Sequence, residues 1–166
     1  MGNLVDLPAR KLASQLFRNF IAGKVPNNEF EDRQPITDDR AIDAIWHTAW
    51  VFYTDRKKHR LEGPYRLPPD QKRACVRWLL FLHGDLPYEW PDMYLPGIDP
   101  AARINNSNSF WRRLFSHQDL RKTDAHGFLS AGHYPVWPYI RVSDYKQSLS
   151  SPKFLSGESK ATGLFA

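Results

Sequence analysis

The strongest constraint on the fold is a helical repeat of apolar residues in the stretch Thr37–Arg60. On a helix these side chains would share one continuous face: Ala41, Ile42, Ile45, Trp46, Ala49, Trp50, Phe52 and Tyr53. Such a repeat is typical of a helix packed on a core. Thr37, Asp38 and Asp39 can cap the start of this helix, and the basic run Arg56–Arg60 suits its C-terminal end. We therefore predict a central helix over Asp38–Arg60.

Two other stretches repeat apolar residues at helical spacing, and a glycine follows each of them. Leu7–Ala22 carries Pro8 near its start, a position that suits proline, and ends before Gly23. Asp70–His83 is the most apolar of the stretches and ends before Gly84. A helix that is apolar nearly all round is usually central and buried. We predict that this helix pairs with the central one in the core.

A fourth helix is indicated by apolar residues that begin at Phe110, and we expect it to end near Arg121. Together these stretches predict a mainly α protein, an irregular bundle of four or five helices around the pair Asp38–Arg60 and Asp70–His83. Phe30 lies in the polar connection before the central helix, and we expect its ring to return to the core.

The segments outside the helices are rich in proline and aromatic residues. Residues 85–100 contain four prolines, which favour an extended and stiff path over a helix or a central strand. Lys122–His133 is predicted to be a loop, and Tyr139–Val142 can form a short edge strand. The chain becomes serine-rich from Lys146. We predict one domain over residues 1–145 and a tail over 146–166, either mobile or bound to the surface.

The composition limits the class of protein. A chain of 166 residues, 42% of them hydrophobic and 14% aromatic, can bury a core as one domain. The single cysteine, Cys75, excludes an intrachain disulfide and favours a reducing compartment. No apolar run reaches the length of a membrane span, and the first residues lack the basic start and apolar core of a signal peptide. These features predict a soluble, cytoplasmic protein that does not bind membranes.

The sequence contains no recognised catalytic, metal or cofactor motif. It has no glycine-rich nucleotide cradle, no nucleophile elbow, and no HExxH or CxxC spacing. Cys75 lies on the most apolar predicted helix, where a thiol is usually inert. His126 and His133 are seven residues apart, which is no recognised ligand spacing, and a hydrated loop explains Glu89 and its acidic neighbours. We predict no catalytic residue, no metal and no cofactor.

The best candidate for a binding site is the acidic, aromatic stretch between residues 88 and 94. The candidate partner-binding residues are Tyr88, Glu89, Trp90, Asp92 and Tyr94. Tyrosine and tryptophan on a stiff backbone offer a large contact area and lose little entropy on binding. The alternative is that Trp90 and Tyr94 fold inward and hold the loop on the helices.

The charge balance leaves two other functions open. The chain has 23 basic and 18 acidic residues, a net charge of +5, and this modest excess is typical of a hydrated surface. A nucleic-acid-associated protein would use the densest run, Arg56–Arg60, with the scattered arginines Arg73, Arg77, Arg112, Arg113 and Arg121. The other alternative is an enzyme whose site is too dispersed to recognise in one sequence.

Three runs carry a resemblance to other proteins: FEDRQP (Phe30–Pro35), AIDAIWHTAW (Ala41–Trp50) and RWLLFLHGDLPYEWP (Arg77–Pro91). Over about Leu12–Pro91 their order and spacing resemble small, uncharacterised, helix-rich bacterial proteins. The resemblance includes no catalytic signature, so it implies no functional residue. Some small proteins of this kind are encoded beside toxins as immunity proteins. This motivates our first function hypothesis, a non-enzymatic bacterial protein that binds a protein partner and acts by steric occlusion, as an immunity protein does when it blocks a toxin.

Overall fold

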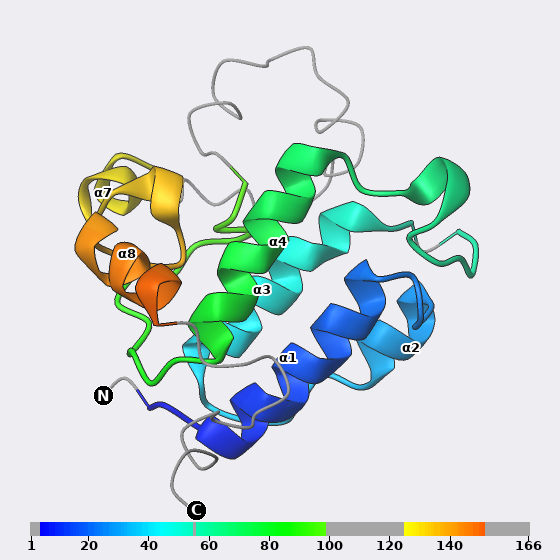
Figure 1. Cartoon of the computed structure of the whole chain (residues 1–166), viewed down its shortest axis with the longest axis horizontal. Helices are drawn as coiled ribbons and strands as arrows, with labels where there is room; N and C mark the ends of the chain where they lie inside the picture. The colour runs from blue at the N-terminus through cyan, green and yellow to red at the C-terminus, as the bar shows by residue number, and fades with distance from the viewer. Residues whose placement is uncertain (1–3, 55, 99–124, 152–166) are drawn as a thin grey trace, which may run out of the picture.

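The computed structural model describes residues 4–54, 56–98 and 125–151, and this part of the chain contains helices and no strand (Figure 1). The elements are α1 (Leu7–Ile21), α2 (Asn27–Asp32), α3 (Arg40–Ala49), η1 (Trp50–Phe52), η2 (Gly63–Tyr65), α4 (Pro69–Leu82), α7 (Ala125–Ser130), η3 (Tyr134–Val136) and α8 (Val142–Ser150). The prediction of a mainly α protein is confirmed. Helix α4 contacts α1, α3 and α8, so the described elements are arranged around it. The helix predicted near Phe110–Arg121 lies outside the described residues.

Helix α1 begins and ends where local signals place it. Its N-cap is Asp6, whose carboxylate accepts a hydrogen bond of 3.0 Å from the backbone N–H of Ala9, and Pro8 lies in its first turn. Gly23 follows the helix with φ of +70°, a left-handed conformation that glycine adopts without steric penalty. These are interactions between near neighbours, and the prediction for this helix is therefore confirmed to within one residue.

The central helix is shorter than predicted. Asp39 caps it as expected, accepting a hydrogen bond of 3.0 Å from the N–H of Ala41. Helix α3 ends at Ala49, however, and only the short 3₁₀ turn η1 follows before the chain becomes irregular. The sequence beyond Ala49 is rich in aromatic, β-branched and basic residues, which lose side-chain freedom or repel one another in a helix.

A buried asparagine gives the backbone after α3 other partners. The side-chain amide of Asn27 donates hydrogen bonds to the carbonyl oxygens of Thr54 (3.0 Å) and Lys57 (3.3 Å). Its side-chain oxygen accepts one of 2.9 Å from the N–H of His59. The N–H of Asn27 also donates to the carbonyl of His59 at 3.0 Å. These bonds between distant parts of the chain replace the last turns of the predicted helix.

The core between the helices is built largely from stacked aromatic rings. Phe30 of α2 is fully buried, as expected, and lies between Phe20 of α1 and Trp46 of α3. Its ring centroid is 4.2 Å from that of Phe20 and 4.0 Å from that of Trp46, and the planes differ by at most 15°. On α4, Trp78 stacks on Phe17 of α1 at 5.9 Å. These ring contacts connect all four N-terminal helices.

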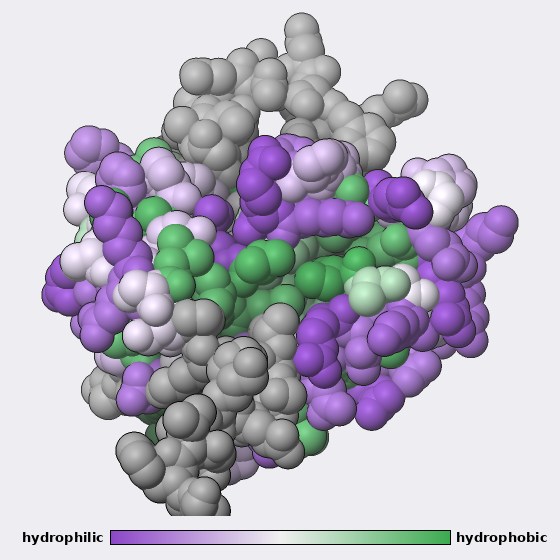
Figure 2. All heavy atoms as spheres, in the orientation of Figure 1, coloured by the Kyte–Doolittle hydropathy of each residue, from purple (hydrophilic) through white to green (hydrophobic). Residues whose placement is uncertain are grey.

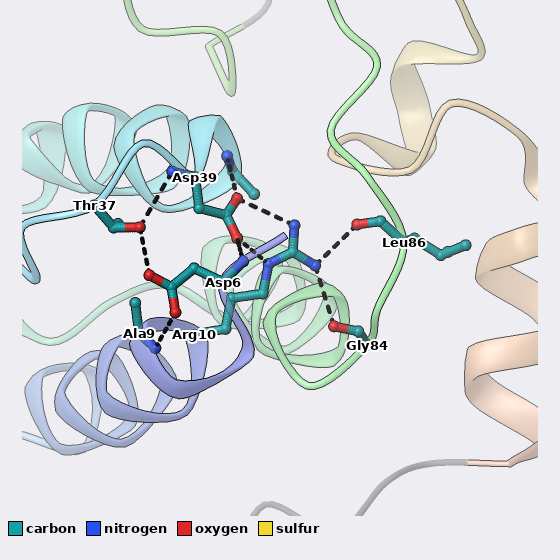
Figure 3. Close-up of polar contacts among 8 residues, drawn as sticks. Asp6, Ala9, Arg10, Thr37, Asp39, Gly84 and Leu86 are labelled. Atoms are coloured by element: carbon teal, nitrogen blue, oxygen red, sulfur yellow. Dashed lines mark hydrogen bonds and ion pairs between the residues drawn. The ribbon is translucent and has the colours of Figure 1, made fainter. Parts of the chain in front are cut away.

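A buried ion pair ties the starts of two helices to the end of a third (Figure 3). Nε of Arg10 lies 2.6 Å from the carboxylate of Asp39, and Nη1 of Arg10 donates to the carbonyl oxygens of Gly84 (3.1 Å) and Leu86 (2.8 Å). The backbone N–H of Asp6 donates to the same carboxylate at 3.0 Å. The pair therefore fixes α1, α3 and the segment after α4 relative to one another.

The C-terminal part of the described chain differs from the prediction in two places. Lys122–His133 was expected to be a loop, but it contains helix α7, because Phe128 is buried and anchors that helix in the core. Tyr139–Val142 does not form a strand; Tyr139 is buried and α8 begins at Val142. Helix α8 then runs across the domain boundary predicted at residue 146, and residues 152–166 lie outside the described part.

Candidate protein-binding surface

Tyr88, the first of the predicted partner-binding residues, is part of the core. Its hydroxyl accepts a hydrogen bond of 3.1 Å from Nε1 of Trp137, and the guanidinium of Arg40 lies 5.6 Å from the centre of its ring. Burial raises the pKa of Tyr88 well above its ordinary value. A phenol that is buried, neutral and hydrogen-bonded in this way is a structural group that a partner does not reach.

Trp90 is likewise inaccessible. Its indole Nε1 donates hydrogen bonds to the carbonyl oxygens of Pro138 (3.0 Å) and Tyr139 (3.3 Å), and its ring packs on Phe128 at 4.8 Å. Gly132 lies so close to this ring that an added Cβ would be 3.1 Å from it. The expectation that Tyr88 and Trp90 present their rings to a partner is therefore wrong. Both rings instead attach the stretch to residues that follow α7.

The other three predicted residues lie on the surface. Asp92 forms an ion pair of 2.6 Å with Arg40. The guanidinium of Arg40 also donates a hydrogen bond of 2.8 Å to the carbonyl oxygen of Trp90. Glu89 lies 3.9 Å from the guanidinium of Arg141. The ring of Tyr94 is 42% exposed. Both carboxylates are thus engaged by arginines of the same chain, so this edge presents little uncompensated negative charge to a partner.

Cys75 and the Asp43–His47 pair are the described groups that catalysis or metal binding would use first. Burial raises the pKa of the Cys75 thiol to about 12, so it stays protonated and unreactive at neutral pH. His47 pairs with Asp43 on the outer side of α3, where both side chains are partly exposed. Within the described ranges, no group of three or more metal-binding side chains occurs. No helix in this part of the chain is long and apolar enough to cross a membrane.

An apolar surface that the sequence analysis did not identify lies across three adjoining helices. Leu12 of α1 is 62% exposed, Val76 of α4 is 52% exposed and Leu149 of α8 is 50% exposed. Helices α1, α4 and α8 all face the viewer in Figure 1, and in the same orientation Figure 2 shows apolar atoms gathered between hydrophilic borders. We call the exposed apolar side chains of these helices, Leu12, Val76 and Leu149, the α1–α4–α8 surface. The prediction that α4 is buried nearly all round is wrong at Val76.

Exposed basic side chains border each part of this surface. Lys72 and Arg73 lie one helical turn before Val76, and Lys146 lies one turn before Leu149. Lys11 is exposed beside Leu12. The α1–α4–α8 surface therefore combines exposed apolar side chains with exposed cations close to them in sequence, and this combination favours an apolar ligand that carries acidic groups.

Arg77, one of the scattered arginines of the nucleic-acid alternative, does not belong to this border. It is half-buried, and its Nε donates a hydrogen bond of 2.6 Å to the carbonyl oxygen of Trp137. Burial lowers the pKa of its guanidinium. Helix α4 thus turns Arg77 toward the segment before α8 and Val76 toward solvent. The wide apolar circumference of α4 was the one signal in the sequence, but it does not tell which part of the helix its neighbours leave uncovered.

Comparisons with protein-family models, with curated proteins and with solved structures found no match for this chain. The chemistry and exposure of the residues described above therefore carry the functional argument.

Proposed function

We propose that this chain is a non-enzymatic protein-binding module whose α1–α4–α8 surface holds an amphipathic, acidic helix of a partner protein. The observation that carries the proposal is the half-exposure of Leu12, Val76 and Leu149 on helices that adjoin. Single exposed apolar side chains are common, but a group of them across neighbouring elements marks an interaction site. Removing such surface from water contributes about 25 cal/mol per Å².

The form of the surface suggests the form of the partner. Neighbouring helices on a bundle create a site on which one more helix packs through apolar side chains at i, i+3, i+4 and i+7. Lys11, Lys72, Arg73 and Lys146 then lie where the flanks of that helix would pass. Acidic residues on those flanks would be attracted and basic ones repelled, which provides specificity as well as faster association.

The direct test uses a synthetic helical peptide with leucines on one face and glutamates beside them, and a matched peptide with lysines in place of the glutamates. We expect the glutamate peptide to bind and the lysine peptide to fail, as measured by fluorescence anisotropy. Val76→Asp should weaken binding by at least about tenfold, because a carboxylate then faces the apolar side of the peptide. The control is Gln71→Asp, which introduces the same negative charge at an exposed position of α4 away from Val76. Equal binding of both peptides, or equal loss in both variants, would contradict the proposal.

Two other occupants give different results. A second copy of the chain would make the wild-type protein a dimer that Val76→Asp converts to a monomer, which light scattering would detect. If the occupant were the chain's own residues 152–166, a chain ending at Ser151 would bind the glutamate peptide much more tightly than the full chain does. Either result would overturn the assignment of the surface to a separate partner.

An immunity protein that occludes a toxin is one form that such a module takes. We propose this role as the expectation that the sequence resemblance carries. Co-expression with a candidate toxin is its test: Gln71→Asp should protect the cell as well as the wild type does, whereas Val76→Asp should not.

A further inference from the structure

A second surface, in the loop between α3 and α4, gathers basic side chains around an exposed tyrosine. Over residues 56–66 the basic side chains are Arg56, Lys57, Lys58, Arg60 and Arg66, and all of them are exposed. The one acidic residue in the same range is Glu62. We call residues 56–66 the basic loop. Four net positive charges in eleven residues is the densest concentration of positive charge on the chain, and it is the kind of field that attracts a polyanion.

The backbone of the basic loop is held in place although it forms little regular structure. The buried side chain of Asn27 bonds to the carbonyl of Lys57 and the N–H of His59, and Arg60 donates a hydrogen bond of 3.4 Å to the carbonyl of Gly23. Leu61 is buried and anchors the middle of the loop. The basic side chains therefore extend from a fixed path, so binding a ligand orders little additional backbone.

An aromatic platform stands within the same loop. The rings of His59 and Tyr65 lie 4.1 Å apart between their centres. His59 is only 8% exposed whereas Tyr65 is 38% exposed, so the accessible part of Tyr65 lies away from His59. Nδ1 of His59 lies 2.8 Å from the carbonyl of Lys57, which keeps the imidazole in position behind the tyrosine. A supported aromatic ring among cations can stack a base while its neighbours contact phosphates.

We propose that the basic loop binds single-stranded nucleic acid, with phosphates at Arg56, Lys57 and Lys58 and a base stacked on Tyr65. The stacked base indicates a single strand, because the bases of a duplex are already stacked on one another. This site contains fewer residues than the scattered set of arginines that the sequence suggested for nucleic-acid binding. Arg77 is engaged by Trp137 within the chain, and Arg112, Arg113 and Arg121 lie outside the described residues.

The test measures anisotropy of a fluorescein-labelled oligothymidine and of a labelled duplex over a series of salt concentrations. We expect the single strand to bind more tightly than the duplex, with an affinity that falls steeply as salt rises. Lys57→Glu/Lys58→Glu should reduce the affinity by at least about tenfold and flatten the salt dependence. Tyr65→Leu should reduce it several-fold and leave the salt dependence unchanged, since the ring contributes stacking and no charge.

The matched control is Lys72→Glu/Arg73→Glu, which makes the same change of charge on α4. It should leave oligothymidine binding nearly unchanged and weaken binding of the glutamate peptide. The proposal for the basic loop and the proposal for the α1–α4–α8 surface can therefore be refuted independently of each other. Circular dichroism of each variant confirms that it is folded. Absence of binding at low salt, an equal loss in the α4 control, or no loss in Tyr65→Leu would each overturn the proposal.

Discussion

Arg10 and Asp39 form a buried ion pair with two contacts: Nε of Arg10 lies 2.6 Å from one carboxylate oxygen of Asp39, and Nη2 lies 3.1 Å from the other. Neither side chain is more than 1% exposed. Asp39 also caps α3, and Arg10 also holds the backbone after α4. One guanidinium thus neutralises a buried charge and satisfies the carbonyl groups of a loop.

We predict that Arg10→Ala lowers the free energy of unfolding by about 3–5 kcal/mol, because it leaves the carboxylate of Asp39 buried without its cation. Urea unfolding followed by circular dichroism measures the loss. Lys11→Ala, at the exposed neighbouring position, should change stability by no more than about 0.5 kcal/mol. Similar stability of the two variants would show that the pair makes no net contribution.

Trp90 is buried and Tyr94 is exposed, so we predict that replacing Trp90 lowers the free energy of unfolding much more than replacing Tyr94 does. Trp90→Ala should lower the free energy of unfolding by about 3–5 kcal/mol, because it removes a fully buried ring and two hydrogen bonds to backbone carbonyls. Tyr94→Ala should lower it by clearly less, about 1 kcal/mol or below, since Tyr94 is 42% exposed. Chemical denaturation of both variants decides the matter, and comparable losses would mean that Trp90 is not a core residue.

Gly97 tests how closely the segment after Trp90 packs on α3. A Cβ at this position would overlap Cγ2 of Thr48 and would lie 2.7 Å from the ring of Trp137. Gly97→Ala should therefore lower the free energy of unfolding by about 1–3 kcal/mol. The hydroxyl of Thr48 accepts a hydrogen bond of 3.1 Å from the N–H of Gly97. Thr48→Ser keeps that hydroxyl and removes the clashing methyl group.

The loss caused by Gly97→Ala should be smaller in the Thr48→Ser background than in the wild type. A double-mutant cycle of unfolding free energies measures this coupling. Strictly additive effects would mean that the methyl group of Thr48 does not limit the space at Gly97.

The Asp43–His47 pair predicts a small dependence of stability on pH. The hydrogen bond to Asp43 raises the pKa of His47 above 6.5, and His47 in turn lowers the pKa of Asp43 below 3.8. Stability contributed by protonated His47 is present below pH 6.5 and is lost as the pH rises through its raised pKa. Stability contributed by ionised Asp43 is present above pH 3.8 and is lost as the pH falls through its lowered pKa. Between pH 3.8 and 6.5 we expect the pair to add about 0.2–1 kcal/mol to the free energy of unfolding, which is the range for an exposed ion pair.

Asp43→Asn isolates this contribution. The difference in unfolding free energy between wild type and variant should be largest between pH 3.8 and 6.5 and should shrink above the raised pKa of His47. Burial lowers the pKa of His83, so the stability that His83 contributes changes with pH in the opposite direction. His83 is present in both proteins, and its contribution therefore cancels from the difference. A difference that stays constant from acid to alkaline pH would contradict the pairing.

The parts of the fold that could be predicted from sequence are those controlled by near neighbours. Asp6, Pro8 and Gly23 act within a turn of α1, and its boundaries follow from them. The end of α3 could not be predicted because the competing hydrogen bonds come from Asn27, which lies 27 residues before Thr54 and 30 residues before Lys57. The residues after Ala49 are weak helix formers, but on their own they do not show that a distant amide ends the helix there.

The direction of the aromatic side chains could not be predicted for a similar reason. Trp90 is buried because its N–H meets the carbonyl oxygens of Pro138 and Tyr139, 48 and 49 residues away. A proline-rich aromatic stretch has the same composition whether it packs inward or faces solvent. The exposure of Val76 depends on which elements cover α4, and that is a property of the assembled fold.

Phe30 has a consequence for how this protein can vary. Its ring fills the gap between Phe20 and Trp46, so the short connection that carries it works as a spacer of fixed thickness. Deleting residues there would either open a void or draw two helices out of alignment with the rest of the bundle. Insertions and deletions should be rejected in the six residues of α2.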